Sequence, residues 1–334
     1  MAAKRYRGMV VGCGAIGVSL EDEPDRPKPG THAGAFSAHK KVELVALVDI
    51  DKKKLRTALK KYPRAKGYTS VAAALRAERP DIVAIATGPS SHVKIVHECV
   101  KAKVAMIICE KPLAHSMKDA RRIQQLVEKS ASVFVVNYQR RFYPLIAAVR
   151  DDIRKGTLGR LQQVSCFYSN GLYNNGGHLI DTLQYLLEDR IVAARGSVNT
   201  RNKTHPKGDS NIDCMLSTSG GTTIAMQSFD QNVYGTSEVR LFGERGAVFI
   251  REYGFTVVRV ALAASHFKGL QQLDYKHGRT VTQPLSAVSG ALEHAIGCHE
   301  KKRRPVSSAE SAAEVVRVLD AISSDARKKV RTVY

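Results

Sequence analysis

The stretch Gly8-Met9-Val10-Val11-Gly12-Cys13-Gly14-Ala15-Ile16-Gly17 decides the fold of this chain of 334 residues. Its apolar start predicts a buried β-strand, and three glycines follow at the spacing Gly-x-Gly-x-x-Gly. Glycines in that context allow a tight turn and let backbone N–H groups approach a pyrophosphate at a helix N-terminus. The stretch therefore predicts a dinucleotide-binding turn. The expected cofactor contacts within it are Gly12, Gly14, Ala15, Ile16 and Gly17.

Outward from this turn, short apolar, β-branched runs alternate with helix-like segments. Such alternation predicts βαβ units, a parallel sheet covered on both faces, and ligand loops at the carboxyl ends of the strands. We therefore expect a doubly wound α/β domain over residues 1–138. The expected strands are Gly8–Gly12, Val42–Val48, Asp81–Ala86, Val104–Cys109 and Ser132–Val136, and the expected helices are Ala33–His39, Lys52–Lys61, Val71–Ala77, His92–Ala102 and Met117–Ser130.

The pattern changes after Tyr138, where strand-like stretches follow one another through hairpin-type turns. This order predicts an α+β domain over residues 139–334, with a large, mainly antiparallel open sheet and helices on one face. The expected helices are Leu145–Lys155, Gly177–Leu187, Leu285–Cys298 and Ala309–Arg327, and the expected strands are Gln162–Ser169, Ala193–Val198, Ile212–Ser217, Thr222–Phe229, Ser237–Phe242, Ala247–Arg251 and Thr256–Ala261.

Asp49 ends the second expected strand. Its carboxylate can accept hydrogen bonds from ribose hydroxyls and would repel a 2′-phosphate, which favours NAD over NADP. Such an acid is expected about 20 residues beyond the glycines, but Asp49 lies 32 residues beyond Gly17. The polar segment 19–30, which contains three prolines, accounts for the excess. Because proline cannot continue a helix, we expect the helix to resume near Thr31. The insertion is either a cover for the cofactor or substrate, or a solvent-exposed decoration.

The bulk composition, 43% hydrophobic and 25% charged, is typical of a globular enzyme, and no apolar stretch approaches the length of a membrane span. Residues 8–20 are a poor signal-peptide core, because glycines interrupt them and an acidic run follows. The net charge of +21 is spread over the chain without a nucleic-acid-binding signature, so it predicts a basic surface that attracts a phosphorylated or nucleotide-linked substrate. Six scattered cysteines without metal-ligand spacing predict buried thiols, a reducing cytoplasm and no metal site.

Six motifs occur in the order seen in the Gfo/Idh/MocA (glucose–fructose oxidoreductase / inositol dehydrogenase) family, which the chain resembles over nearly its whole length. The motifs are Gly12–Gly17, Asp49, Thr87-Gly88-Pro89-Ser90-Ser91-His92, Glu110-Lys111-Pro112, Asn137-Tyr138-Gln139-Arg140-Arg141-Phe142 and His178-Leu179-Ile180-Asp181. The loop before Thr31-His32, together with Asn174–His178, resembles a subgroup linked to surface-polysaccharide and amino-sugar pathways.

The resemblance implies a Rossmann domain followed by a sheet domain that often forms homodimers or homotetramers. It implies oxidation of a sugar or cyclitol carbon, or the reverse reduction, with NAD as cofactor. It also implies that the Lys111–Pro112 bond is frequently cis. Beyond the glycine turn and Asp49, the implied cofactor contacts are Thr87, Gly88, Pro89, His92, Glu110, Lys111 and Gln139.

Lys111 and His178 are the expected proton-handling residues. Hydride transfer from a secondary alcohol needs a group that takes the hydroxyl proton, and the reverse reaction needs a donor. Lys111 follows an expected strand, and partial burial beside an oxidised nicotinamide would lower the pKa of a lysine toward neutrality. His178 matches the family's catalytic histidine and can act as acid, base or relay. Asp181, one helical turn further on, is expected to be structural and to orient His178.

Asn174 departs from the family pattern, since many members carry a carboxylate four residues before the histidine. An amide cannot act as a base at neutral pH, so Asn174 is expected to bind substrate, together with Tyr173. Arg140 and Arg141 are expected either to bind phosphate or carboxylate groups or to brace the junction between the domains. The leading function is an NAD-dependent sugar dehydrogenase or ketoreductase. The alternative, prompted by Asn174, is a dinucleotide-binding sensor or scaffold without catalytic activity.

Overall fold

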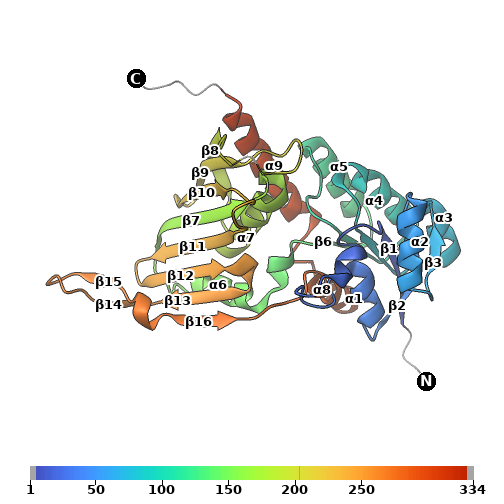
Figure 1. Cartoon of the computed structure of the whole chain (residues 1–334), viewed down its shortest axis with the longest axis horizontal. Helices are drawn as coiled ribbons and strands as arrows, with labels where there is room; N and C mark the ends of the chain where they lie inside the picture. Colours follow the sequence, from blue (N-terminus) through green and yellow to red (C-terminus); the bar gives the residue numbers. More distant parts are fainter. Residues whose placement is uncertain (1–4, 203, 329–334) are drawn as a thin grey trace. The chain divides into compact units, whose positions relative to one another are not determined.

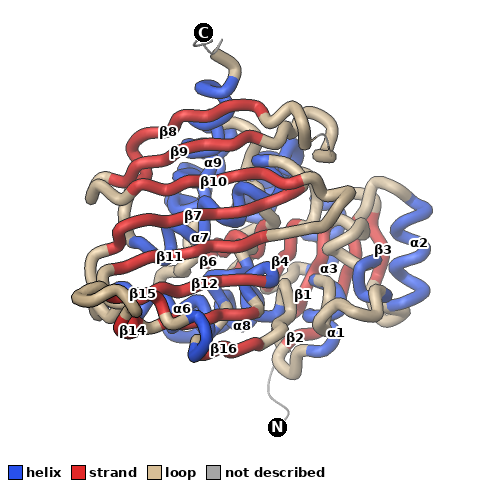
Figure 2. Tube along the Cα trace, turned by 60° about the vertical axis from the view of Figure 1, so that its left-hand side comes forward, coloured by secondary structure: helices blue, strands red, loops and turns tan. Residues whose placement is uncertain are grey.

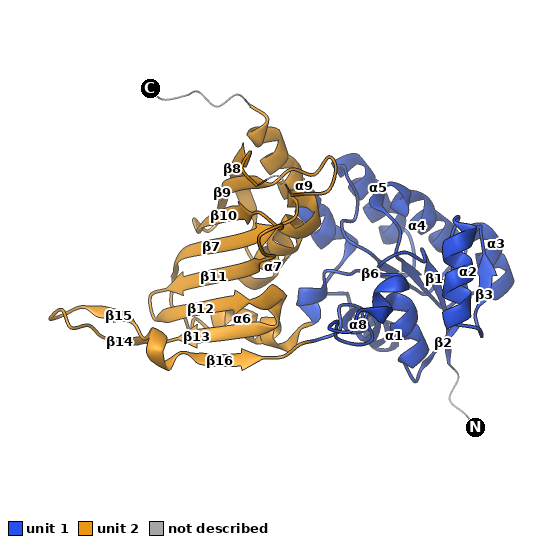
Figure 3. Cartoon of the chain, viewed as in Figure 1, with its two compact units in different colours: residues 1–142, 285–316 blue, residues 143–284, 317–334 orange. Residues whose placement is uncertain are grey.

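The computed structural model describes residues 5–202 and 204–328, which form two compact units (Figure 3). Unit 1 runs to residue 142 and also takes in residues 285–316, whereas unit 2 holds residues 143–284 and the chain from 317 onward. The expected division, which gave everything after residue 138 to the second domain, is corrected here. Helix α8 (Ser289–Lys301) inserts Leu292 and Ile296 into the hydrophobic core of unit 1. Its apolar face did not reveal which sheet it would cover.

The sheet of unit 1 has six parallel strands in the order β3-β2-β1-β4-β5-β6 (Figure 1). The order reverses between β1 and β4, which is the point where doubly wound sheets bind ligands. The expected fold class is confirmed. The three-residue strand β3 was not predicted, because Lys-Gly-Tyr contains no apolar run. The strands are β1 (Tyr6–Val11), β2 (Val42–Val48), β3 (Lys66–Tyr68), β4 (Ile82–Ile85), β5 (Met106–Cys109) and β6 (Val133–Val136).

Five helices connect these strands, and each begins within one residue of its predicted start. They are α1 (His32–Ala38), α2 (Lys52–Lys61), α3 (Val71–Glu78), α4 (His92–Lys101) and α5 (Met117–Glu128). Four of them have a side chain that accepts a hydrogen bond from a backbone N–H of the first turn: Thr31, Asp51, Ser70 and Ser116. Such caps satisfy N–H groups that the helix itself cannot pair, so they mark helix starts in the sequence.

The 19–30 insertion lies between the glycine turn and α1, and two backbone hydrogen bonds join the turn to α1 across it. His32 N donates to Ile16 O at 3.0 Å, across the insertion. Ala33 N donates to Gly17 O, also at 3.0 Å. The expectation that the helix resumes near Thr31 is confirmed.

The sheet of unit 2 has eight strands in the order β16-β13-β12-β11-β7-β10-β9-β8 (Figure 2). The β7–β10 pair is parallel and the other described pairs are antiparallel, so the expected mainly antiparallel sheet is confirmed. Along β7, Cys166 and Tyr168 are fully buried, while Phe167 on the other face is partly exposed. The strands are β7 (Leu161–Ser169), β8 (Ile191–Val198), β9 (Ile212–Thr218), β10 (Thr223–Phe229), β11 (Ser237–Gly243), β12 (Gly246–Arg251), β13 (Thr256–Val260) and β16 (Arg279–Thr282).

Helices cover one face of this sheet (Figure 2). They are α6 (Pro144–Arg154), α7 (Gly177–Leu187) and the last turns of α9 (Ala309–Ala326). A two-stranded hairpin, β14 (Leu262–Ala264) and β15 (Gln271–Leu273), extends beyond the sheet (Figure 1). The hairpin and β16 were not predicted, because their strands are only three or four residues long and are largely polar or exposed.

Two expectations from composition can be compared with the described residues. All six cysteines lie within them, and each is buried and unpaired, as expected. Among these residues the structure contains no helix with the length and apolar character needed to cross a membrane.

Candidate active site

The predicted cofactor residues of unit 1 lie at one edge of its sheet. Gly12 directly follows β1, Asp49 follows β2, and Thr87 lies two residues beyond β4. Glu110 and Lys111 follow β5. Because parallel strands end at the same edge of a sheet, the four loops that carry these residues come together there.

The glycine turn is shaped by two different constraints. Gly12 has a φ of 98°, and a Cβ there would lie 2.7 Å from Ala86 O. A Cβ on Gly17 would lie 1.9 Å from Gly12 O, so the turn itself requires both glycines. A Cβ on Gly14 or Gly88, in contrast, would meet no described atom within 4 Å. The space in front of these two residues is what a pyrophosphate needs to approach the backbone.

Asp49 is held beside the glycine turn by backbone amides. Its Oδ2 accepts from Cys13 N at 2.7 Å, and its Oδ1 accepts from Asp51 N at 2.8 Å. The carboxylate stays partly exposed, and each oxygen keeps a lone pair for a ribose hydroxyl. The neighbouring Ile50 is 89% exposed, so it offers an apolar surface on which an adenine ring can pack. Sequence reasoning did not single out Ile50.

The side chain of His92 supports the loop that contains Thr87. Its ring is fully buried, with Nδ1 3.0 Å from Leu113 O and Nε2 3.0 Å from Thr87 O. Burial lowers the pKa of this histidine, although the two carbonyls act in the opposite direction. The prediction placed His92 among the cofactor contacts. Its side chain instead holds the loop that carries Thr87, Gly88 and Pro89.

Glu110 is a buried carboxylate directly before Lys111. Its Oε1 accepts from His32 Nε2 at 2.8 Å and from Asn137 Nδ2 at 2.7 Å, and its Oε2 accepts from Lys111 N at 3.2 Å. Burial acts to raise the pKa of Glu110, but the two side-chain donors and the charge of Lys111 outweigh it and hold that pKa below its ordinary value. Glu110 is therefore a buried anion. Sequence reasoning gave no role to His32 or Asn137, although His32 stands directly after a helix-capping threonine.

The turn after β6 contains the two predicted arginines. Gln139–Phe142 form a single 3-10 turn in which Gln139 is partly exposed, while Arg140 and Arg141 are 4% and 9% exposed. Arg141 Nη1 donates to Val306 O at 2.7 Å within unit 1. This hydrogen bond joins two segments of unit 1. It tests neither contact with a substrate nor bracing of the junction between the domains. The Lys111–Pro112 bond is cis, as the resemblance implies.

His178 is the second residue of α7 in unit 2, and it is partly exposed. The residues before it, Leu172–Gly176, form a π-helical turn. Asp181 is 1% exposed, and this burial suits the structural role expected of it. The described residues contain no group of three or more histidine, cysteine, aspartate or glutamate side chains that could hold a metal ion.

Another buried carboxylate, which sequence reasoning missed, supports the π-helical turn. Asp209 accepts from Tyr173 N through Oδ1 and from Asn174 N through Oδ2, each at 2.8 Å. A Cβ on Gly171, whose φ is 92°, would lie 2.3 Å from Asp209 Oδ2, so only glycine permits this approach. Burial raises the pKa of Asp209, and the amide hydrogen bonds oppose this only in part. Its sequence neighbours are typical of an ordinary surface turn, so no signal marked it.

Tyr173 and Asn174 both use their side chains within unit 2. The Tyr173 hydroxyl donates to Asp320 Oδ1 at 2.7 Å, and Asn174 Nδ2 donates to Asn170 O at 3.1 Å. The first hydrogen bond ties the turn to α9 and gives Tyr173 a structural role. Asn174 stays partly exposed.

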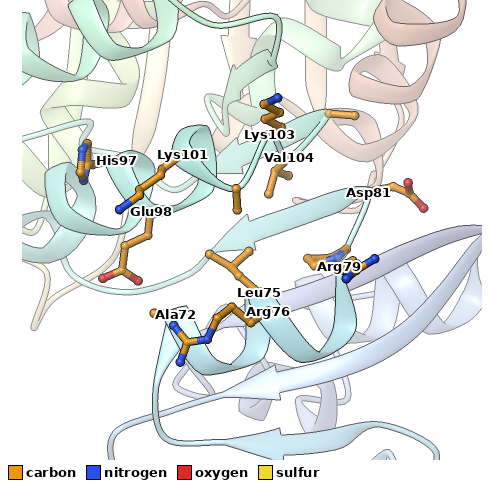
Figure 4. A pocket seen from close by; sticks show the side chains of 13 residues that line it. Ala72, Leu75, Arg76, Arg79, Asp81, His97, Glu98, Lys101, Lys103 and Val104 are labelled. Carbon is orange, nitrogen blue, oxygen red and sulfur yellow. The ribbon is translucent and has the colours of Figure 1, made fainter.

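A cavity of about 1010 Å³ in unit 1 lies at the opposite edge of the sheet (Figure 4). Its lining includes Arg76 and Arg79 at the end of α3, and Lys101 and Lys103 at the end of α4. Cations in those positions complement the partial negative charge of helix C-termini. Because the cavity lies at the edge where β4 and β5 begin, it is separate from the candidate active site, which lies at the edge where these strands end.

The strand order, the glycine turn at the switch point and the carboxylate on the neighbouring strand define a dinucleotide-binding protein. Sequence comparison supplies the family. Residues 7–138 match the profile of the GFO_IDH_MocA oxidoreductase family with an NAD-binding Rossmann fold, and residues 146–249 match the GFO/IDH/MocA C-terminal domain. The chain belongs to the Gfo/Idh/MocA family of oxidoreductases, and its cofactor is NAD.

Curated relatives match part of the chain. A D-apiose dehydrogenase from Paraburkholderia graminis is 31% identical over 216 residues, which are 59% of this chain and 54% of that protein. An inositol 2-dehydrogenase from Rubrobacter xylanophilus is 29% identical over 210 residues, 57% of this chain and 59% of that protein. The chain thus spans somewhat more than half the length of these relatives.

Solved structures match the fold over nearly the whole chain. The WlbA dehydrogenase from Bordetella pertussis, in complex with NADH and UDP-GlcNAcA, is 18% identical with a TM-score of 0.76 and covers 98% of both chains. An aldose-aldose oxidoreductase from Caulobacter crescentus is 19% identical with a TM-score of 0.78 and covers 97% of this chain and 98% of the other. At these identities the likeness shows the fold alone.

Proposed function

We propose that this protein transfers a hydride between NAD and a secondary alcohol or ketone carbon of a sugar. The observation that carries the proposal is the position of Lys111. It is partly exposed at the carboxyl end of β5, on the same edge as Gly14 and Asp49. The names of the curated relatives, D-apiose dehydrogenase and inositol 2-dehydrogenase, support a sugar or cyclitol as the substrate class.

The residues at this edge fit a bound NAD. The open space at Gly14 and Gly88 suits the pyrophosphate and the nicotinamide half, and Asp49 suits the adenosine ribose. When bound, the cofactor supplies the carbon that accepts or returns the hydride. The negative charge of Asp49 would repel a 2′-phosphate, so we infer a preference for NAD over NADP.

In this proposal Lys111 and His178 together handle the proton of the hydroxyl group on the reacting carbon. During oxidation the C–H hydrogen leaves with its electron pair as hydride, and the hydroxyl proton passes to Lys111 Nζ. His178 hydrogen-bonds the same hydroxyl and relays the proton. Reduction uses the same groups in reverse. Asn174 can orient the sugar but cannot take up a proton at neutral pH, which leaves this task to Lys111 and His178.

The formal net charge of +21 supports a substrate that carries negative charge. A strongly basic protein attracts anionic ligands and raises their local concentration. We therefore propose a phosphorylated or nucleotide-linked sugar as substrate. An amino sugar is the third class proposed, in line with the subgroup that the loop before Thr31 resembles. A panel of sugars, inositols, hexose phosphates and nucleotide sugars, assayed for NADH production, would rank these classes.

Lys111→Ala tests the proton-handling role. Turnover should fall at least about a hundredfold, because the general acid–base group is removed. The dissociation constant for NADH, measured by fluorescence titration, should change little. His178→Ala should lower turnover by about tenfold or more.

Lys118→Ala, on the exposed side of α5, is the matched control and should leave turnover unchanged. Wild-type turnover in Lys111→Ala would refute the role of Lys111. If the wild-type protein binds NADH but turns over no member of the panel, the alternative of a dinucleotide-binding sensor is favoured.

We also propose that the uncovered face of the unit 2 sheet joins copies of the chain into a homodimer or homotetramer. The guanidinium carbon of Arg240 lies 4.8 Å from the ring centroid of Phe167 and 6.0 Å from that of Phe249. The ring centroids of Phe249 and Phe242 lie 5.6 Å apart. Met215 on the same face is 46% exposed. A broad face of aromatic and apolar side chains suits a partner surface.

Light scattering after size exclusion tests this assembly. Phe249→Glu should convert the oligomer to monomer, because it removes an aromatic contact and places a carboxylate that must lose its water in the apolar interface. Ser37→Glu adds the same charge to an exposed site on α1 and should leave the mass unchanged. A wild-type protein that elutes as a monomer would exclude the proposal.

A further inference from the structure

We propose that His32 is a positioning residue for Lys111, and that the 19–30 insertion serves to fix His32 in place. His32 holds Glu110 as an oriented buried anion, and Glu110 in turn anchors the backbone of Lys111. This inference rests on the proposed role of Lys111 as the proton-handling group. It gives the insertion a purpose that neither a cover nor a decoration would explain.

The geometry forms a chain of three contacts. His32, 1% exposed, donates from Nε2 to Glu110 Oε1 at 2.8 Å. The other oxygen of Glu110 accepts from Lys111 N at 3.2 Å. Asn137 Nδ2 donates to the same Oε1 as His32, at 2.7 Å, so the carboxylate is fixed from two sides. A carboxylate held at both oxygens cannot rotate, and the Lys111 backbone is fixed with it.

The insertion fixes the residue that precedes His32. Glu21 Oε2 accepts from Thr31 Oγ1 at 2.6 Å and from Gly30 N at 3.0 Å. Thr31 Oγ1 also caps α1 by accepting from Gly34 N at 3.1 Å. The insertion is thus tied to the first turn of α1 through a side chain of its own, and this turn begins with His32.

Four titratable groups interact with Glu110, and they come from separate elements. They are His32 on α1, Lys111 beside it, His92 on α4 and Cys109 at the end of β5. Burial acts to raise the pKa of Glu110, and the hydrogen bond from His32 is the first of the effects that lower it. Without that donor, the effect of burial, which raises the pKa of Glu110, should outweigh the remaining effects that lower it. Glu110 should then take up a proton at a higher pH.

The experiment combines infrared spectroscopy with kinetics on the full-length protein. The band of the protonated Glu110 carboxyl group is isolated by subtracting the spectrum of a matched variant that also carries Glu110→Gln. In His32→Leu the midpoint of this band should lie at least about one pH unit above that of the wild type. Turnover should fall about tenfold with KM and NADH affinity nearly unchanged, because only the position of Lys111 is disturbed.

His32→Gln keeps an N–H donor and should recover most of both effects. His39→Gln removes a histidine that pairs with Glu293 at the far end of α1, 3.0 Å apart, and should change neither. An unmoved Glu110 midpoint in a folded His32→Leu protein overturns the inference, whatever Lys111→Ala does. A shifted midpoint together with normal turnover in Lys111→Ala supports the hold on Glu110 and refutes the proposed function instead.

Discussion

Glu110 in unit 1 and Asp209 in unit 2 are both buried carboxylates next to a predicted catalytic segment, yet their environments act in opposite directions. The pKa of Glu110 lies below its ordinary value, because side-chain donors and a neighbouring lysine outweigh burial. The pKa of Asp209 lies above its ordinary value, because burial outweighs the backbone amides and the charge of His205 that act to lower it. Burial therefore does not by itself decide the charge of a carboxylate; its partners do.

The difference in pKa between Glu110 and Asp209 suits the different tasks of the two carboxylates. Glu110 supports the loop of a lysine that is expected to change its charge during the reaction, and a fixed anion there keeps the field around Lys111 constant. Asp209 supports the backbone of Tyr173 and Asn174, where geometry matters more than charge. The following predictions test this contrast between an electrostatic support and a geometric one.

Glu110→Gln should have the largest effect. The glutamine can still accept from His32 and Asn137, but its amide then faces Lys111 N, and the charge that balances the cluster is lost. We expect the free energy of unfolding to fall by about 3 kcal/mol. Urea denaturation at neutral pH measures it. Glu293→Gln removes an exposed partner of His39, whose side chain pairs at 3.0 Å, and should change stability by less than about 0.5 kcal/mol.

Asp209→Asn should cost less, about 1 kcal/mol. One backbone N–H loses its acceptor, but the penalty of burying a charge disappears with the substitution. The same urea titration applies. A loss larger than that of Glu110→Gln would mean that Asp209 is the electrostatic support and would reverse the comparison.

The pH dependence of these two differences should have opposite signs. For Glu110 the lowered pKa contributes stability that is full above its ordinary value of 4.5 and is lost as the pH falls below it, so the gap between wild type and Glu110→Gln should close in acid. For Asp209 the raised pKa contributes stability that is full below its ordinary value of 3.8 and is lost as the pH rises through the raised pKa. The gap between wild type and Asp209→Asn should therefore narrow toward neutral pH. Unfolding curves from about pH 7 down to about pH 2.5 compare the two. Parallel trends would contradict the contrast.

Tyr173→Phe should have the smallest effect. It removes the hydrogen bond to Asp320 at 2.7 Å, but both residues are partly exposed, so water can replace the lost partner. We expect a loss of about 0.5 kcal/mol. Thermal unfolding measures it, and a loss above about 2 kcal/mol would show that the turn depends on α9 more than on Asp209.

Patterns within short stretches of sequence predicted much of the fold. Apolar runs marked the long strands, and their alternation with helix-like segments marked the helices of unit 1. The glycine turn and Asp49 identified the cofactor edge, because their roles depend on backbone geometry that a short stretch encodes. The short strands of the β14–β15 hairpin carried no such signal. The apolar face of α8 predicted a buried helix, but it did not indicate which of the two sheets the helix would cover.

The sequence by itself determined the parallel sheet, the dinucleotide turn and the two segments that carry Lys111 and His178, since each depends on neighbours a few residues apart. Only the tertiary structure decided that His32 meets Glu110 across 78 positions and that Asp209 meets Asn174 across 35. Those contacts set the charge of one carboxylate and the placement of the other. They arise because strands and helices bring distant loops to one edge, which no local pattern records.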